Sequence, residues 1–128
     1  MANTIVSGVT DIVENGVAIC TFSGIVASGY GTWQSLSQFP DKWVQVYGTF
    51  SGSSSISIRG SNDPTRPVAS GGNARILTSA CGAALTFTSA NSKTILDNPK
   101  WLQFIETGAM TGASVRAHIQ IVCQSLKR

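Results

Sequence analysis

The stretch that decides the fold is residues 42–64, which read KWVQVYGTFSGSSSISIRGSNDP. Its first half alternates apolar and polar side chains with a period of two, which predicts a strand with one buried face. After a turn of Ser and Gly residues the alternation resumes, and it places Ile56 and Ile58 inward. The stretch therefore predicts a β-hairpin that ends at the turn Gly60–Pro64.

A similar pattern returns later in the chain. Residues 100–104, KWLQF, repeat the pattern of residues 42–46, KWVQV, and they also lead through a Gly/Thr turn into an alternating strand over residues 115–123. We therefore expect two such hairpins to frame the domain, with Trp43 and Trp101 packing at one end of it.

The rest of the chain adds short strands separated by turn signals. Residues 89–98 are expected to form a loop or a single helical turn, with Ile95 and Leu96 packed inward. Roughly seven or eight strands without a convincing helix predict an all-β fold, and the mixed connections favour a jelly-roll-like antiparallel β-sandwich. Besides those already named, strands are expected at residues 4–10, 17–22, 76–77 and 84–88.

The length of 128 residues indicates a single domain with one core. We expect residues 1–10 to form an N-terminal arm or edge strand, able to add a strand to a neighbour, and residues 11–128 to form the β-sandwich domain. The N-terminus lacks a basic region followed by a long apolar run, so no secretory signal is expected. No stretch approaches the length of a transmembrane helix, so no membrane partner is expected either.

The chain carries few charges. Only 12% of residues are charged, so Ser, Thr, Asn, Gln and Gly must supply the polar surface, which suits a protein that covers much of its surface with a partner. The net charge is +3 and the basic residues are scattered, which argues against nucleic acid as a partner. Cys20, Cys81 and Cys123 are odd in number and widely spaced, which argues against a disulfide framework and favours a reducing cytoplasm. Cys81 and Cys123 are expected to behave as small buried hydrophobes.

Catalytic and metal-binding patterns are weak. His118 is the chain's one histidine, and no Ser- or Cys-centred nucleophile motif accompanies it. The acidic residues stand singly beside turn formers, unlike the carboxylate pair of a glycosidase. Asn62 and Asp63 offer too few oxygens for calcium. We therefore expect no enzyme activity, no cofactor and no metal.

The outward faces of the strands are the candidate contact surface. An exposed aromatic residue such as Tyr47 among small polar side chains is typical of a surface that meets a partner. A sugar-stacking role for the aromatic residues is the alternative, and packing explains most of them better. The expected partner-contact residues are Gln45, Tyr47, Ser55, Ser57, Arg59, Arg116, His118 and Gln120.

Five segments carry a resemblance to a known family. They are WVQVYGTFSG (43–52), ISIRGSND (56–63), LTFT (85–88), NPKWLQ (98–103) and TGASV (111–115). Together they resemble the capsid decoration, or cementing, proteins of tailed bacteriophages, over roughly residues 40–122. The family's GSNDG-NW continuation is here GSNDPTR, and its R-Y-R-P strand is here KWLQF, so the resemblance supports the fold more than individual contacts.

The resemblance implies a jelly-roll-like virion protein without catalysis. Such a protein is made in the host cytoplasm, binds the outside of an assembled capsid and clamps neighbouring subunits of the major capsid protein, commonly as a homodimer or homotrimer. The W-Q-V…GSND arrangement also echoes discoidin-like β-sandwiches, which leaves a carbohydrate-binding module as the alternative function.

Overall fold

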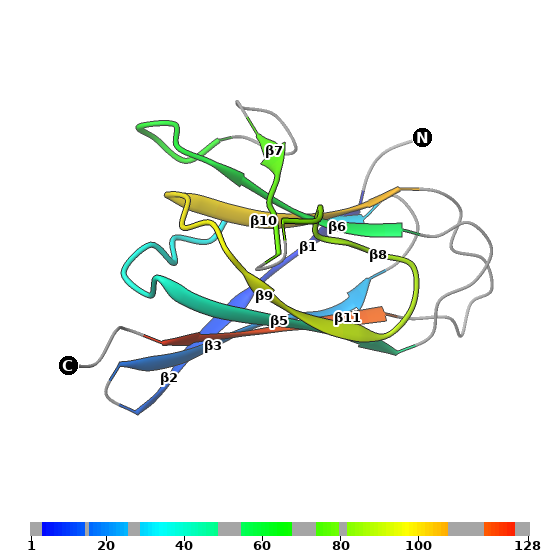
Figure 1. Cartoon of the computed structure of the whole chain (residues 1–128), viewed down its shortest axis with the longest axis horizontal. Coiled ribbons are helices and arrows are strands. Elements are labelled where there is room, and N and C mark those ends of the chain that lie inside the picture. The colour runs from blue at the N-terminus through cyan, green and yellow to red at the C-terminus, as the bar shows by residue number, and fades with distance from the viewer. Residues whose placement is uncertain are drawn as a thin grey trace.

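The structure is a computed structural model that describes residues 4–14, 16–25, 29–48, 55–67, 74–79, 82–107 and 117–124. In these residues the chain forms eleven strands and no helix. The strands make two sheets that face each other, with the core between them (Figure 1). The predicted all-β, jelly-roll-like sandwich is confirmed.

We call the two layers sheet A and sheet B. Neighbouring strands are antiparallel in both, except that β1 and β4 run parallel at one edge of sheet A. Sheet A has the order β1 (Thr4–Val6), β4 (Gly29–Gly31), β10 (Trp101–Thr107), β6 (Ser55–Ser61) and β7 (Arg75–Ile76), with β8 (Thr86–Phe87) also paired to β6. Sheet B has the order β2 (Val9–Glu14), β3 (Val17–Ile25), β11 (Ala117–Gln124), β5 (Asp41–Gly48) and β9 (Asn91–Ile95).

The predicted hairpins are wrong. β5 lies in sheet B and β6 in sheet A, and β10 and β11 are divided between the sheets in the same way. Each KW segment therefore starts a strand whose successor lies in the opposite sheet, about 10 Å away. The true partners are β5 with β11 and β6 with β10, so the two repeated units interlock. Alternation identifies a buried face, but it does not identify the strand that pairs beside it.

Two local expectations also fail. Residues 91–95 form the edge strand β9 beside β5 instead of a loop or helical turn, and Leu96 is 59% exposed, whereas Ile95 is buried as expected. Trp43 is 45% exposed on sheet B, and Trp101 is half-buried on sheet A beside Arg66, so the two rings do not pack at one end. At the N-terminus, β1 and β2 pair within the chain's own sheets, and the division at residue 10 stays a prediction.

The core is centred on two aromatic rings. Phe22 of β3 and Phe104 of β10 are fully buried and meet edge to face, with ring centroids 5.0 Å apart and planes at 71°. A Cβ at Gly31 would lie 2.5 Å from Phe22 Cε1 and 2.7 Å from Phe104 Cδ1, so this position accepts only glycine without displacing a ring. The contact joins the two sheets, because β3 belongs to sheet B and β10 to sheet A.

Two cysteines lie on the inner face of sheet B. Cys20 and Cys123 are free thiols with no exposed surface, so the expected role as a small buried hydrophobe is confirmed for Cys123, and Cys81 lies outside the described residues. Burial raises the pKa of Cys20 to about 11 and that of Cys123 to about 12.

These thiols predict a loss of stability at alkaline pH. The unfolded chain ionises its thiols near pH 9, whereas the folded chain keeps them protonated to about pH 11–12. Their contribution is therefore fully present below pH 9 and is lost as the pH rises, by about 2 kcal/mol for Cys20 at pH 11. Urea unfolding between pH 7.5 and 11 measures this slope.

The matched control is the double variant Cys20→Ala, Cys123→Ala. Burial lowers the pKa of Lys42, so the contribution of Lys42 to stability rises as the pH rises. This change is opposite in sign to that of the thiols, and it is present in both proteins. The double variant is therefore expected to lose less stability than the wild type over this range. Equal slopes in the two proteins would contradict the prediction.

Candidate functional site

The middle of the solvent-facing side of sheet B presents ten side chains in register. Side chains of cross-strand partners point to the same face of a sheet, so the pairing defines rows across β3, β11, β5 and β9. We call these residues the outer face of sheet B: they are Ile19, Val122, Trp43 and Thr94 in one row, Thr21, Gln120, Gln45 and Ser92 in the next, and His118 and Tyr47 in the third.

Four of the expected contact residues form one block on this face. Gln45 lies opposite Gln120, and Tyr47 lies opposite His118. The rings of Tyr47 and His118 stack with centroids 5.2 Å apart and planes at 27°. Strands β5 and β11 thus bring together side chains that are more than 70 positions apart in the sequence. Their role in contacting a partner stays a prediction.

Apolar side chains of this face lie within the block and next to it. Trp43 is 45% exposed and Tyr47 is 38% exposed, and Ile19 and Val122 are half-buried. None of the ten residues is an Asp, Glu, Lys or Arg, and the same pairing adds two exposed carboxylates at the border, Asp11 opposite Ile19 and Asp41 opposite Gln124. A patch that exposes aromatic rings, with its charges confined to the border, has the composition of a protein–protein interface with an apolar core and a polar rim.

Sequence reasoning did not include Trp43 among the contact residues, although the signal was present. The alternation that places Gln45 and Tyr47 outward also places Trp43 outward. A tryptophan at the start of a strand was instead assigned to packing, because tryptophan is highly buried on average. By contrast, Lys42 is buried with 1% exposure on the inner face, and its Nζ donates a hydrogen bond to Asn98 Oδ1.

The other expected contact residues do not lie on this face. Ser55, Ser57 and Arg59 belong to β6 in sheet A. Ser57 alternates with the core residues Ile56 and Ile58, so it faces away from the core as predicted, but it is only 6% exposed. Its hydroxyl hydrogen-bonds that of Thr86 at 3.0 Å, on the strand that pairs beside it. Arg116 lies outside the described residues.

Arg59 is half-buried and belongs to a structural network. Its Nε donates to Gln103 Oε1 at 3.2 Å, and Gln103, which is fully buried, donates through Nε2 to the carbonyl oxygen of Gly31 at 2.8 Å. This network ties together β6, β10 and β4. Arg59 therefore stabilises sheet A through Gln103. The alternation in the sequence predicts only that Arg59 points outward, and does not predict this hydrogen bond.

The described residues contain no group of three or more His, Cys, Asp or Glu side chains placed to hold a metal ion. In the same part of the chain, no helix is both long and apolar enough to cross a membrane. His118 has Tyr47 as its ring neighbour.

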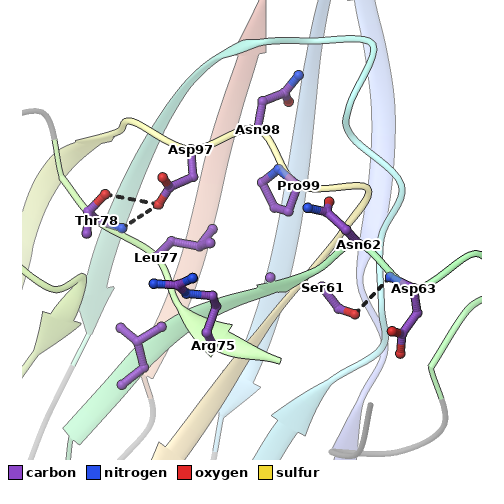
Figure 2. Close-up of a pocket in the computed structure, with 11 residues that line it drawn as sticks. Ser61, Asn62, Asp63, Arg75, Leu77, Thr78, Asp97, Asn98 and Pro99 are labelled. Atoms are coloured by element: carbon purple, nitrogen blue, oxygen red, sulfur yellow. Dashed lines mark hydrogen bonds between the residues drawn. The ribbon is translucent and has the colours of Figure 1, made fainter. Parts of the chain in front are cut away.

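A separate cavity of about 550 Å³ lies beside the Gly60–Pro64 turn (Figure 2). The turn is held in place by sheet A: Lys100 N donates to Asn62 Oδ1 at 2.9 Å, and Trp101 Nε1 donates to the carbonyl oxygen of Asp63 at 3.0 Å. Asp63 N in turn donates to Ser61 Oγ at 3.2 Å. The turn is therefore a fixed wall of the cavity.

Comparison with known proteins gives similarity at the level of fold. No family model and no curated protein matches the sequence. Among solved structures, the SPBc2 prophage-derived protein YomS matches with a TM-score of 0.60 and 14% identity, covering 90% of this chain and 100% of YomS. A cupin domain from Bordetella pertussis Tohama I matches with a TM-score of 0.46 and 11% identity, covering 98% of this chain and 99% of the cupin. The chain is thus similar in fold to a prophage-derived protein over that protein's whole length.

Proposed function

We propose that this chain is a non-enzymatic phage virion protein that binds the outer surface of an assembled capsid and stabilises contacts between major capsid protein subunits. The outer face of sheet B is the contact surface. The observation that carries the proposal is the exposure of the Trp43 and Tyr47 rings on this face, whose ten residues carry no charge. The fold similarity to prophage-derived YomS supports a phage origin.

The size of this face indicates how such binding would work. Four strands spaced about 4.8 Å apart and roughly 24 Å long give a face on the order of 500 Å². A stable one-to-one complex buries about 800 Å² on each partner, so one face alone gives weak binding. Repetition around a symmetric shell, and association into a homodimer or homotrimer, would supply the remaining affinity through multivalency.

The low charge of the chain fits the same role. Long-range steering by charge contributes little here, because the net charge is only +3 and the charges beside the outer face of sheet B are two border carboxylates, Asp11 and Asp41. Binding through this face would therefore depend mainly on buried apolar area and on hydrogen bonds from Gln45 and Gln120. Such binding is expected to persist at high salt, because salt screens charge interactions and leaves apolar burial intact.

The test is co-sedimentation of the purified chain with assembled shells of the phage whose genome encodes it. We expect saturable binding that survives 0.5 M NaCl, a concentration that shortens the Debye length to roughly 4 Å, and a higher melting temperature of the decorated shells. Unassembled capsid protein is the control, and it is expected to bind weakly because it lacks the repeated arrangement. A failure to sediment with shells at any salt concentration would overturn the proposal.

A further inference from the structure

The cavity beside the Gly60–Pro64 turn is built by three segments that are distant in sequence. They are the end of β6 with its turn, β7 with the two residues after it, and the connection between β9 and β10. Its volume of about 550 Å³ lies within the range of small-molecule sites. None of the ten residues of the outer face of sheet B lines it. It is therefore a second site, separate from the proposed capsid contact.

The floor of the cavity is apolar and closely packed. Leu77 is 4% exposed and Pro99 is buried. A Cβ at Gly60 would lie 2.5 Å from Pro99 Cγ and 2.9 Å from Leu77 Cδ2, so the absence of a side chain at Gly60 lets both residues pack against the strand. The floor therefore offers a fixed apolar surface to a ligand.

The walls hold polar groups with hydrogen-bonding capacity left over. Asp97 accepts hydrogen bonds at Oδ2 from Thr78 N at 2.7 Å and Thr78 Oγ1 at 3.0 Å, which fixes the carboxylate and leaves Oδ1 as an acceptor. Asn62 accepts at Oδ1 from Lys100 N, which leaves its amide N–H groups as donors. Arg75 is exposed at the rim, and Figure 2 shows these three side chains arranged around Leu77 and Pro99.

The charges of these walls select the class of ligand. Arg75 and Asp97 carry opposite charges, so the carboxylate repels an anionic ligand and the guanidinium repels a cationic one. In Figure 2 the Asp63 carboxylate points away from Pro99, so Asp63 adds mainly its backbone to the wall. A neutral ligand with many hydroxyl groups satisfies both charges, because a hydroxyl donates to a carboxylate and accepts from a guanidinium or an amide.

We propose that this cavity binds a neutral saccharide. Hydroxyl groups of the sugar donate to Asp97 Oδ1 and accept from Arg75 and the Asn62 amide. The C–H face of a sugar ring rests on Leu77 and Pro99. This binding goes beyond capsid attachment: because the outer face of sheet B is on another part of the molecule, a shell-bound copy keeps the cavity available to external glycans.

The test is a titration followed by NMR of the ¹⁵N-labelled protein, with neutral probes and charged derivatives of two of them. Triacetylchitotriose is neutral and its deacetylated form is cationic; lactose is neutral and sialyllactose is anionic; maltotriose and cellotriose extend the neutral set. We expect at least one neutral probe to shift the amide signals of Asn62, Thr78 and Asp97. Where that probe has a charged derivative, the affinity of the derivative is expected to be lower by about tenfold or more.

Variants assign the binding to the cavity. Arg75→Ala and Asp97→Asn are each expected to weaken the neutral probe about tenfold or more, and Asn at 97 retains an acceptor for Thr78. Gln45→Ala, on the outer face of sheet B, is the matched control and is expected to leave sugar binding unchanged. The proposal is overturned if no neutral probe binds, if a charged probe is preferred, or if Arg75→Ala keeps full affinity. Arg75→Ala is expected to bind shells normally, so failure here is distinguishable from failure of capsid binding.

Discussion

Replacing Phe104 by alanine is expected to lower the free energy of unfolding by about 3–5 kcal/mol. Phe104 is fully buried, meets Phe22 edge to face and lies against Gly31, so its removal opens a cavity at the contact between the two sheets. Gly31 has no side chain to move into that space. Urea unfolding followed by tryptophan fluorescence measures the change.

Two further variants keep this prediction testable. Tyr47→Ala removes an aromatic ring from a position that is 38% exposed, and it is expected to cost less than about 1 kcal/mol. Phe104→Leu keeps most of the buried volume and is expected to cost about 1.5 kcal/mol or less, so it reports on the site if Phe104→Ala does not fold. A Phe104→Ala protein as stable as Tyr47→Ala would show that the sheets do not meet at this ring.

Replacing Trp43 by alanine is expected to weaken binding to shells by about 30-fold or more, while the protein stays folded. Trp43 is 45% exposed, and tryptophan residues near the centre of an interface commonly contribute about 2 kcal/mol or more to binding. Without the indole ring, a gap remains between the cross-strand neighbours Val122 and Thr94, so the contact with the shell is incompletely filled. Co-sedimentation over a range of protein concentrations measures the affinity.

The matched control is Ile76→Ala. Ile76 is 44% exposed, almost the same as Trp43, but it lies on β7 in sheet A. Its replacement removes exposed apolar surface of a similar kind from the opposite layer, and binding to shells is expected to stay within about twofold of the wild type. Equal losses in the two variants would mean that the outer face of sheet B is not the contact surface.

The sequence predicts which side chains face inward better than it predicts which strands pair. Alternation correctly places Val44 and Val46 inside and Gln45 and Tyr47 outside, because one pleated strand with one buried face requires it. The hairpin between β5 and β6 was wrong, since the residues between two strands do not say whether the chain turns back or crosses to the opposite sheet. The repeated KW pattern was a real signal, and it marks the starts of two strands, β5 and β10, that lie in different sheets.

Edge strands and networks were the hardest features to predict. β9 has only Ile95 fully buried among five residues, so it lacks the apolar alternation that identifies a strand, and it forms because β5 offers it a free edge. Ser57 reads as an outward polar residue, but β8 pairs beside it and its hydroxyl binds Thr86. Tertiary neighbours decide the outcome in both cases.

The two candidate sites differ in how far the sequence alone predicts them. The block of Gln45, Tyr47, His118 and Gln120 follows from alternation within two strands, which a single sequence contains. The cavity depends on Asn62 and Asp97, which are distant in the sequence and line one cavity only in the folded chain, and on the absence of a side chain at Gly60. In the sequence the Asn62-Asp63 turn offers too few oxygens for calcium, and in the structure it forms one wall of the cavity.

The most direct test of the central claim is a cryo-EM map of shells decorated with this protein. We expect sheet B to face the shell, with Trp43, Tyr47 and Gln120 within about 4 Å of major capsid protein atoms and with β6 and β7 on the side away from it. A map in which the outer face of sheet B points to solvent and sheet A contacts the shell would contradict the proposal.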